Sequence, residues 1–201
     1  MAAVKLSYFN FSGGRGEDCR LALHMAGVPF EDDRIDPKDW PAQKASTPFG
    51  GMPVLEIEGE GVLSQSNAIL GLIGTRHGLL PENDFEAARH RAVLNAVEDL
   101  RCVVNRTSLI PEEERKSARE EVARGYMRSW AEDLEMQIRG PFVGGDQISV
   151  ADLKVFVVVG SYKRGTLDHF PTDYFDSHEK ISGLYDAVMR HPKVATWYGE
   201  H

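Results

Sequence analysis

The segment Pro48–Ile57 and the helix start that follows it carry groups suited to binding a small peptide. Pro53 begins a short apolar strand, where a proline is tolerated, and the backbone N–H and C=O groups of Met52 remain available to an extended ligand. Gln65 and Ser66 stand where a helical pattern begins, so a side-chain amide, a hydroxyl and unpaired backbone N–H groups can meet a carboxylate. These residues predict a site for a ligand that has both a peptide backbone and a carboxylate.

Tyr8 is a third candidate for chemistry. It ends the predicted strand Val4–Tyr8 and precedes a glycine-containing loop that leads into a helix, so its hydroxyl can project into the cleft where Met52 and Gln65 converge. Tyrosine is also an ordinary strand residue, and by spacing alone a packing role in the core or at an interface is the more frequent one. The residues by themselves therefore leave two roles open for Tyr8.

The elements that must position these residues fall into two groups. Periodicity and turn residues predict strands and helices in the order βαβ and then ββα, at Val4–Tyr8, Arg15–Met25, Phe30–Ile35, Val54–Ile57, Gly61–Leu63 and Ser66–His77. The remainder is predicted to be helical, at Phe85 to about Leu109, Pro111 to about Ile138, Ser149 to about Tyr162 and Ser177–Arg190, with a short turn near Trp197. Ser149 and Asp152 have the spacing of a capping box, which indicates a structural role. We expect an α/β domain at residues 1–79 and an all-helical domain at residues 84–201.

Composition narrows the range of partners. The 201 residues include 23 basic and 31 acidic ones, and the resulting net charge of −8 argues against nucleic acid or an anionic membrane surface as the main partner. No run approaches the roughly 20 apolar residues of a membrane span, and the N-terminus lacks the pattern of a secretory leader, which predicts a cytoplasmic protein. Cys19 and Cys102 are too few for a disulfide framework, and the histidines lack metal-ligand spacing, so no metal site is expected.

The run Pro-Phe-Gly-x-Met-Pro-Val-Leu-Glu at residues 48–56, with Ser64-Gln65-Ser66 and Tyr8, resembles the glutathione-binding domain of cytosolic glutathione transferases. It is most similar to the sigma class, and the resemblance covers nearly the whole chain. It implies a thioredoxin-like N-terminal domain followed by an all-α C-terminal domain. It also implies glutathione as co-substrate and Tyr8 as the catalytic residue, whose hydroxyl stabilises the glutathione thiolate.

The resemblance implies roles for further residues. The glutathione site would comprise Tyr8, Arg15, Trp40, Lys44, Gly51, Met52, Pro53, Gln65, Ser66 and Asp99. Of these, Asp99 would reach across a homodimer to the neighbouring subunit's ligand, and Phe49 stands where some classes insert an aromatic side chain into the partner. The small hydrophobic electrophile would lie above the sulfur, among Phe9, Phe11, Arg15, Arg101, Val104, Asn105 and Ser108.

Three departures from the family pattern bear on activity. Gly51 stands where similar proteins usually have Gln or Lys, which removes one contact to the tripeptide. One extra residue lies between Tyr8 and Arg20, and Cys19 lies within the first predicted helix, which argues against a cysteine-based mechanism. Three functions stay open: conjugation of glutathione to an electrophile, glutathione-dependent isomerisation or peroxide reduction, and a weakly catalytic binding or structural module.

Overall fold

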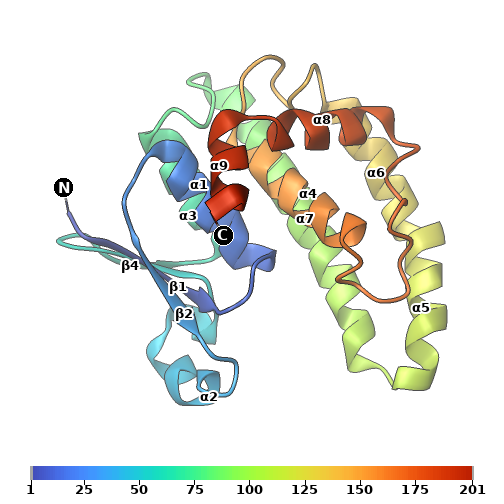
Figure 1. Cartoon of the computed structure of the whole chain (residues 1–201), viewed down its shortest axis with the longest axis horizontal. Coiled ribbons are helices and arrows are strands. Elements are labelled where there is room, and N and C mark those ends of the chain that lie inside the picture. The colour runs from blue at the N-terminus through green and yellow to red at the C-terminus, as the bar shows by residue number, and fades with distance from the viewer. Residues whose placement is uncertain (1, 201) are drawn as a thin grey trace.

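A four-stranded sheet forms one end of the molecule in the computed structural model, which describes residues 2–200 (Figure 1). Its strand order is β2-β1-β3-β4, with bounds Val4–Phe9 (β1), Glu31–Ile35 (β2), Val54–Ile57 (β3) and Gly61–Ser64 (β4). β1 and β2 are parallel, whereas β3 is antiparallel to both of its neighbours. Leu6 and Tyr8 alternate with more exposed residues in β1, so both point to the helix-covered face of the sheet.

Short helical segments connect the strands and complete this domain. The helix α1 (Gly14–Ala26) joins β1 to β2, and α3 (Ser66–Arg76) follows β4. Between β2 and β3 lie α2 (Trp40–Gln43) and two 3-10 turns, Lys44–Ser46 and Pro48–Gly50. The order is the predicted βαβ–ββα order, and the thioredoxin-like fold class followed by an all-helical domain is confirmed.

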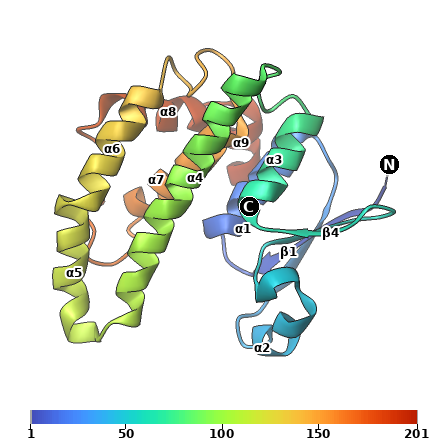
Figure 2. The same cartoon turned by 180° about the vertical axis from the view of Figure 1, so that it is seen from behind.

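The remaining helices form a bundle beside α1 and α3, as both views show (Figures 1 and 2). Their bounds are Asp84–Arg106 (α4), Glu112–Arg124 (α5), Tyr126–Gln137 (α6), Val150–Lys163 (α7), Glu179–Met189 (α8) and Pro192–Glu200 (α9), with a 3-10 turn at Thr107–Leu109. None of the helices within residues 2–200 is long and apolar enough to cross a bilayer.

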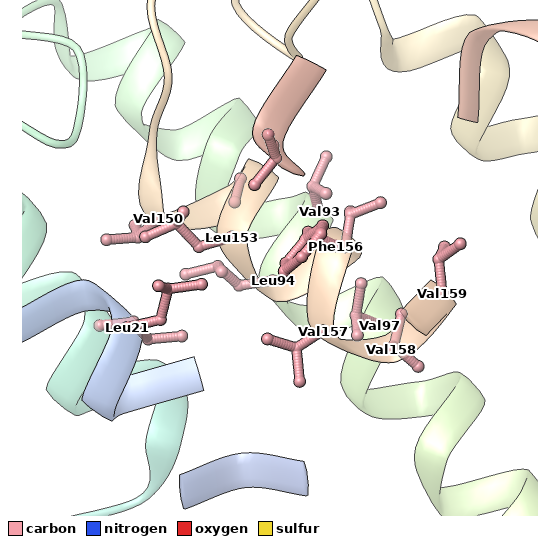
Figure 3. Close-up of a cluster of buried hydrophobic side chains, with 14 of the residues drawn as sticks. Leu21, Val93, Leu94, Val97, Val150, Leu153, Phe156, Val157, Val158 and Val159 are labelled. Atoms are coloured by element: carbon pink, nitrogen blue, oxygen red, sulfur yellow. The ribbon is translucent and has the colours of Figure 1, made fainter. Parts of the chain in front are cut away.

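The helix α7 is the centre of the core. It packs against both α1 and α4, and Figure 3 shows its Phe156 beside Leu94 of α4 and its Val150 and Leu153 on the side toward Leu21 of α1. Because α7 is surrounded on all sides, its residues are apolar around almost the whole circumference rather than along one stripe.

The predicted capping box at the start of α7 is confirmed. The Ser149 N–H donates to Asp152 Oδ2 at 2.8 Å, and the Ser149 hydroxyl accepts from the backbone at Ala151. The second carboxylate oxygen of Asp152 accepts the Val143 N–H at 2.7 Å, so the box also fastens the preceding loop to α7.

Two predicted elements were wrong in extent. The single helix expected from Pro111 to about Ile138 is two helices, because Gly125 adopts φ −102° and ψ −94° between α5 and α6. The short turn expected near Trp197 is the nine-residue helix α9, whose Trp197 indole donates to the buried Glu17 of α1 at 2.8 Å. The domain limits 1–79 and 84–201 stay predictions, and their outer ends, Met1 and His201, lie outside the described residues.

Candidate functional site

The register of the sheet places the predicted site residues at one edge. Ser7 of β1 pairs with Val54 of β3, so Pro53 and Met52 continue level with the end of β1. Val54 also pairs with Ser64 at the end of β4, where α3 begins. Strand ends that are far apart in sequence therefore meet, and the loops that follow them form a continuous surface.

Tyr8 is packed tightly against the start of α1. A Cβ on Gly16 would lie 2.1 Å from Cδ1 of the Tyr8 ring, and one on Gly14 would lie 2.9 Å from its hydroxyl. The two glycines thus allow the ring to lie directly on the helix backbone, and Gly14, at φ +64°, also needs the conformational freedom of glycine. The phenol is held at the first turn of α1.

The environment of Tyr8 keeps its hydroxyl protonated. Burial raises the pKa of Tyr8 above its ordinary value of 10.0, and the nearby charge of Arg15 offsets this only in part. The phenol therefore keeps its O–H, which can donate to a ligand in the adjacent cleft.

The residues Gln65 and Ser66 form the N-terminus of α3. Gln65 is the N-cap residue, and its backbone has φ +74°, a left-handed conformation that non-glycine residues rarely adopt and that clusters at binding sites. Ser66 is buried while Gln65 is exposed. The first backbone N–H groups of a helix have no intrahelical acceptor, so this terminus can receive an anion.

Five further predicted glutathione residues lie on the loop between β2 and β3, namely Trp40, Lys44, Gly51, Met52 and Pro53. Trp40 packs edge-on against Phe9, with ring centroids 6.0 Å apart, and the exposed Lys44 runs its aliphatic stem past Gly50. Gly51 is extended, at φ −143° and ψ 162°. The Met52–Pro53 peptide bond is cis, and Pro53 immediately precedes β3 as predicted.

A cleft of about 520 Å³ opens beside the Tyr8 hydroxyl, between α1, α4 and the end of α7. It is lined by five of the seven residues predicted to bind the electrophile: Phe11, Arg15, Arg101, Val104 and Asn105. Phe9 and Ser108 do not line it. Phe9 is the last residue of β1 and stacks on Phe11, and the Ser108 hydroxyl accepts from Arg119 at 3.0 Å.

Sequence reasoning missed the side of the cleft formed by the end of α7. Val158, Ser161, Tyr162, Arg164 and Leu167 line it there. The first three lie in α7, whose largely apolar sequence indicates a core helix, and Arg164 and Leu167 follow the end of that helix. Gly160 leaves room for the Arg164 guanidinium, because a Cβ at that position would lie 2.7 Å from it, and this contact is visible only in the structure.

One buried and one partly buried ion pair join α1 to α4 beside the cleft. The Arg101 guanidinium binds both carboxylate oxygens of Asp18, one of them at 2.9 Å, and Arg15 Nε donates to Glu98 at 2.7 Å. Burial alone would raise the pKa of Glu98, but hydrogen bonding from Arg15 and the charge of Lys154 outweigh it, and the pKa is lowered. The carboxylates of Glu98 and Asp18 thereby hold Arg15 and Arg101 in place beside the cleft.

Asp99 and Phe49 lie elsewhere. Asp99 is one position along α4 from Glu98 and faces away from the cleft, into a groove of about 440 Å³ between α4 and α6 that also contains Tyr126 and Trp130. Phe49, in the 3-10 turn before β3, is 87% exposed and has φ +56°. Among residues 2–200 no three His, Cys, Asp or Glu side chains are grouped to hold a metal ion.

Comparison with known proteins gives matches over the whole chain. The family model of the glutathione S-transferase N-terminal domain matches residues 4–74, and that of the C-terminal domain matches residues 98–201. Glutathione S-transferase 1 of Ascaris suum is 30% identical, covering 100% of this chain and 97% of that protein. Hematopoietic prostaglandin D synthase of Gallus gallus is 29% identical, covering 98% and 96%. The structure of prostaglandin synthase D of Nilaparvata lugens superimposes with a TM-score of 0.88 at 29% identity, covering 99% and 98%.

Proposed function

Since the chain belongs to the glutathione S-transferase family and is similar to its sigma-class members, we propose that it binds glutathione as a thiolate and conjugates it to a small hydrophobic electrophile. Members of this family use glutathione as co-substrate. The observation that carries the proposal is the protonated Tyr8 hydroxyl, fixed between the start of α1 and the cleft.

Tyr8 acts by stabilising the thiolate. A cysteine thiol has a pKa of about 8.5, and lowering it by two units requires about 2.7 kcal/mol of preferential stabilisation of the anion. A hydrogen bond to a charged acceptor contributes roughly 1.5–3 kcal/mol, so the phenol O–H supplies most of this amount. The nearby charge of Arg15 and the start of α1 add to it. The thiol proton passes to solvent when glutathione binds, and Tyr8 keeps its own proton.

The loops at the edge of the sheet orient the tripeptide. The backbone of Met52 pairs with the cysteinyl residue, and Gln65 and Ser66 at the start of α3 receive the γ-glutamyl carboxylate. Trp40 and Lys44 meet the glycine carboxylate through an indole N–H and a charge. Lys44 is exposed, and within residues 2–200 its ammonium group forms no ion pair with a carboxylate. Its charge is therefore available to a ligand, which supports this role.

The electrophile occupies the cleft beside the sulfur. Phe11 and Val104 contact its apolar part, and Asn105 offers a polar group. The sulfur attacks the electrophilic carbon, a C–S bond forms, and with an aryl halide the C–halogen bond breaks and halide leaves. Holding both reactants in one cleft replaces an encounter in solution by an oriented contact.

Thiolate absorbance tests the proposal directly. Glutathione bound to the wild-type protein is titrated against pH in an ultraviolet difference experiment, alongside Tyr8→Phe. We expect bound glutathione to ionise about two pH units below the free thiol in the wild type, and close to the free value in Tyr8→Phe. Binding without a shift, or no binding, would support the weakly catalytic module instead.

We also propose a homodimer. Phe49 is 87% exposed, and a groove of about 440 Å³ between α4 and α6, which contains Asp99, is open to a side chain from a second copy. Sedimentation of Phe49→Ser is expected to give a monomer where the wild type gives a dimer. Leu109→Ser, which removes a side chain of similar exposure, is the control. A dimer unaffected by Phe49→Ser would leave Phe49 as a surface residue.

An isomerase activity is the second candidate, because a curated relative and a solved structure are described as prostaglandin D synthases. The same thiolate would serve that reaction without being consumed. Mass balance separates the two: conjugation consumes one glutathione for each product molecule, whereas isomerisation consumes none.

A further inference from the structure

Lys154 is a fully buried lysine in the most apolar helix of the protein. It lies in the first half of α7 between Leu153 and Val155, and none of its side chain is exposed. Burying a lysine among apolar residues is unfavourable unless its ammonium group finds partners. Its Nζ donates to Glu98 Oε2 at 3.0 Å and lies 3.9 Å from Asp18 Oδ2, and its two remaining contacts are to the start of α3.

These two contacts are made to Ser66 and Asn67, at the proposed binding site of the γ-glutamyl carboxylate. Nζ lies 3.5 Å from Ser66 Oγ and donates to Asn67 Oδ1. An ammonium group only donates, so Ser66 Oγ must accept, which leaves the hydroxyl proton for a ligand. The amide of Asn67 is held at both ends, since its Nδ2 donates to Asn95 Oδ1 at 2.8 Å. Lys154 therefore fixes the side chains of the first two residues of α3.

The charges around Lys154 do not balance. Its ion pairs form a connected cluster of five residues, in which Lys154 contacts Glu98 and Asp18, Glu98 contacts Arg15, and Asp18 contacts Arg101. Three cations thus share two carboxylates. A ligand carboxylate bound at Ser66 would lie near Lys154 Nζ and would supply the missing negative charge there.

We propose that Lys154 is a positioning residue for the γ-glutamyl carboxylate of glutathione, acting through Ser66 and through the uncompensated positive charge of its cluster. This inference rests on the proposed glutathione site. It assigns to α7 of the helical domain a part in binding a carboxylate whose proposed direct contacts within the same chain, Gln65 and Ser66, lie in the α/β domain. It also predicts that the contribution of Lys154 depends on the carboxylate being present.

A comparison of two ligands tests that dependence. Dissociation constants are measured by calorimetry for glutathione and for γ-aminobutyryl-cysteinyl-glycine, which lacks only the α-carboxylate. Lys154→Met should weaken glutathione binding about tenfold, the weak end of the range for a charge-assisted hydrogen bond, and change binding of the analogue less than about twofold. Turnover at saturating glutathione should stay within about twofold, so the loss appears in KM.

Further variants distinguish an effect of Lys154 on the binding site from a general loss of stability. Lys154→Arg keeps the charge and should retain most of the preference for glutathione. Arg119→Met removes a cation whose side chain is only 4% exposed, bound to Thr107 and Asp168 far from α3 in the chain, and should leave both dissociation constants unchanged. If Lys154→Met does not fold, Lys154→Gln, which keeps hydrogen bonding without charge, gives the same comparison.

The outcomes are distinct. An equal loss for both ligands, or no loss for either, would overturn the role of Lys154 while the wild type still binds glutathione. A lowered affinity confined to glutathione would support it. A wild-type protein that binds neither ligand would overturn the proposed function, and the inference with it.

Discussion

Replacing Gly16 by alanine should disable catalysis without unfolding the protein. The new Cβ would lie 2.1 Å from Cδ1 and 2.3 Å from Cγ of the Tyr8 ring, and 2.8 Å from its Cβ. Because the Cβ of Tyr8 is fixed by the β1 backbone, rotating the ring about its own side-chain bonds does not relieve all three contacts. The ring must move by at least about 1.3 Å, the gap between 2.1 Å and ordinary contact at 3.4 Å.

The expected magnitudes follow from that displacement. A misplacement of about 1 Å in a catalytic group costs on the order of a hundredfold in rate, or about 2.7 kcal/mol of transition-state stabilisation. Overpacking costs about 1–3 kcal/mol of stability, and replacing glycine by alanine in a helix returns about 0.5–1 kcal/mol. We therefore expect a net destabilisation of about 0–2.5 kcal/mol, which leaves most molecules folded.

The assay combines turnover with the thiolate titration. Gly16→Ala should lower kcat for an aryl halide about a hundredfold and shift the pKa of bound glutathione toward the value in Tyr8→Phe. Gly183→Ala is the matched control, because Gly183 lies in α8 with no atom within 4 Å of an added Cβ. Its activity should be unchanged. Wild-type turnover and thiolate pKa in Gly16→Ala would refute the argument that close packing of Tyr8 sets its position.

Three further changes test other parts of the structure. The lowered pKa of Glu98, an acid with an ordinary value of 4.5, means that its stabilising contribution is complete above pH 4.5 and is lost as the pH falls toward the folded value. Glu98→Gln should therefore destabilise the protein by about 1–3 kcal/mol at pH 7 and by less at pH 3, measured by urea unfolding at both values. Ser149→Ala should cost about 1 kcal/mol in the same experiment, and an unchanged midpoint would show that the cap is dispensable. Gly51→Gln should lower the KM for glutathione about two- to tenfold by adding one hydrogen bond, since its extended backbone accepts any side chain; an unchanged KM would place that position outside the site.

Much of the fold could be predicted because its signals are local. The alternation in β1, the capping pair Ser149 and Asp152, and the glycines of the tight turns depend on neighbours within a few residues, and these features were found where the sequence predicts them. The break at Gly125 was missed because both flanking segments have strong helical patterns, and a single glycine is tolerated in many helices.

The sequence alone determined which polar groups are candidates for the site. A tyrosine at the end of the first strand, a proline before the third and a hydroxyl at the start of α3 are visible in the sequence as candidate groups, although the residues alone leave a packing role open for the tyrosine. The resemblance to glutathione transferases added their roles, which stay predictions for Trp40 and Lys44 as for the others.

Only the tertiary structure decided what surrounds these groups. Strand register brings Tyr8, Met52 and Ser66 to one edge, and the packing of α7 between α1 and α4 places Lys154 beneath the last of them. A lysine within an apolar run is unusual and is visible in the sequence. Its partners cannot be identified there, because they lie 56 and 88 positions away. Electrostatic and packing interactions depend on the distance between groups in space. For residues far apart in the sequence, that distance is set only when the whole chain has folded.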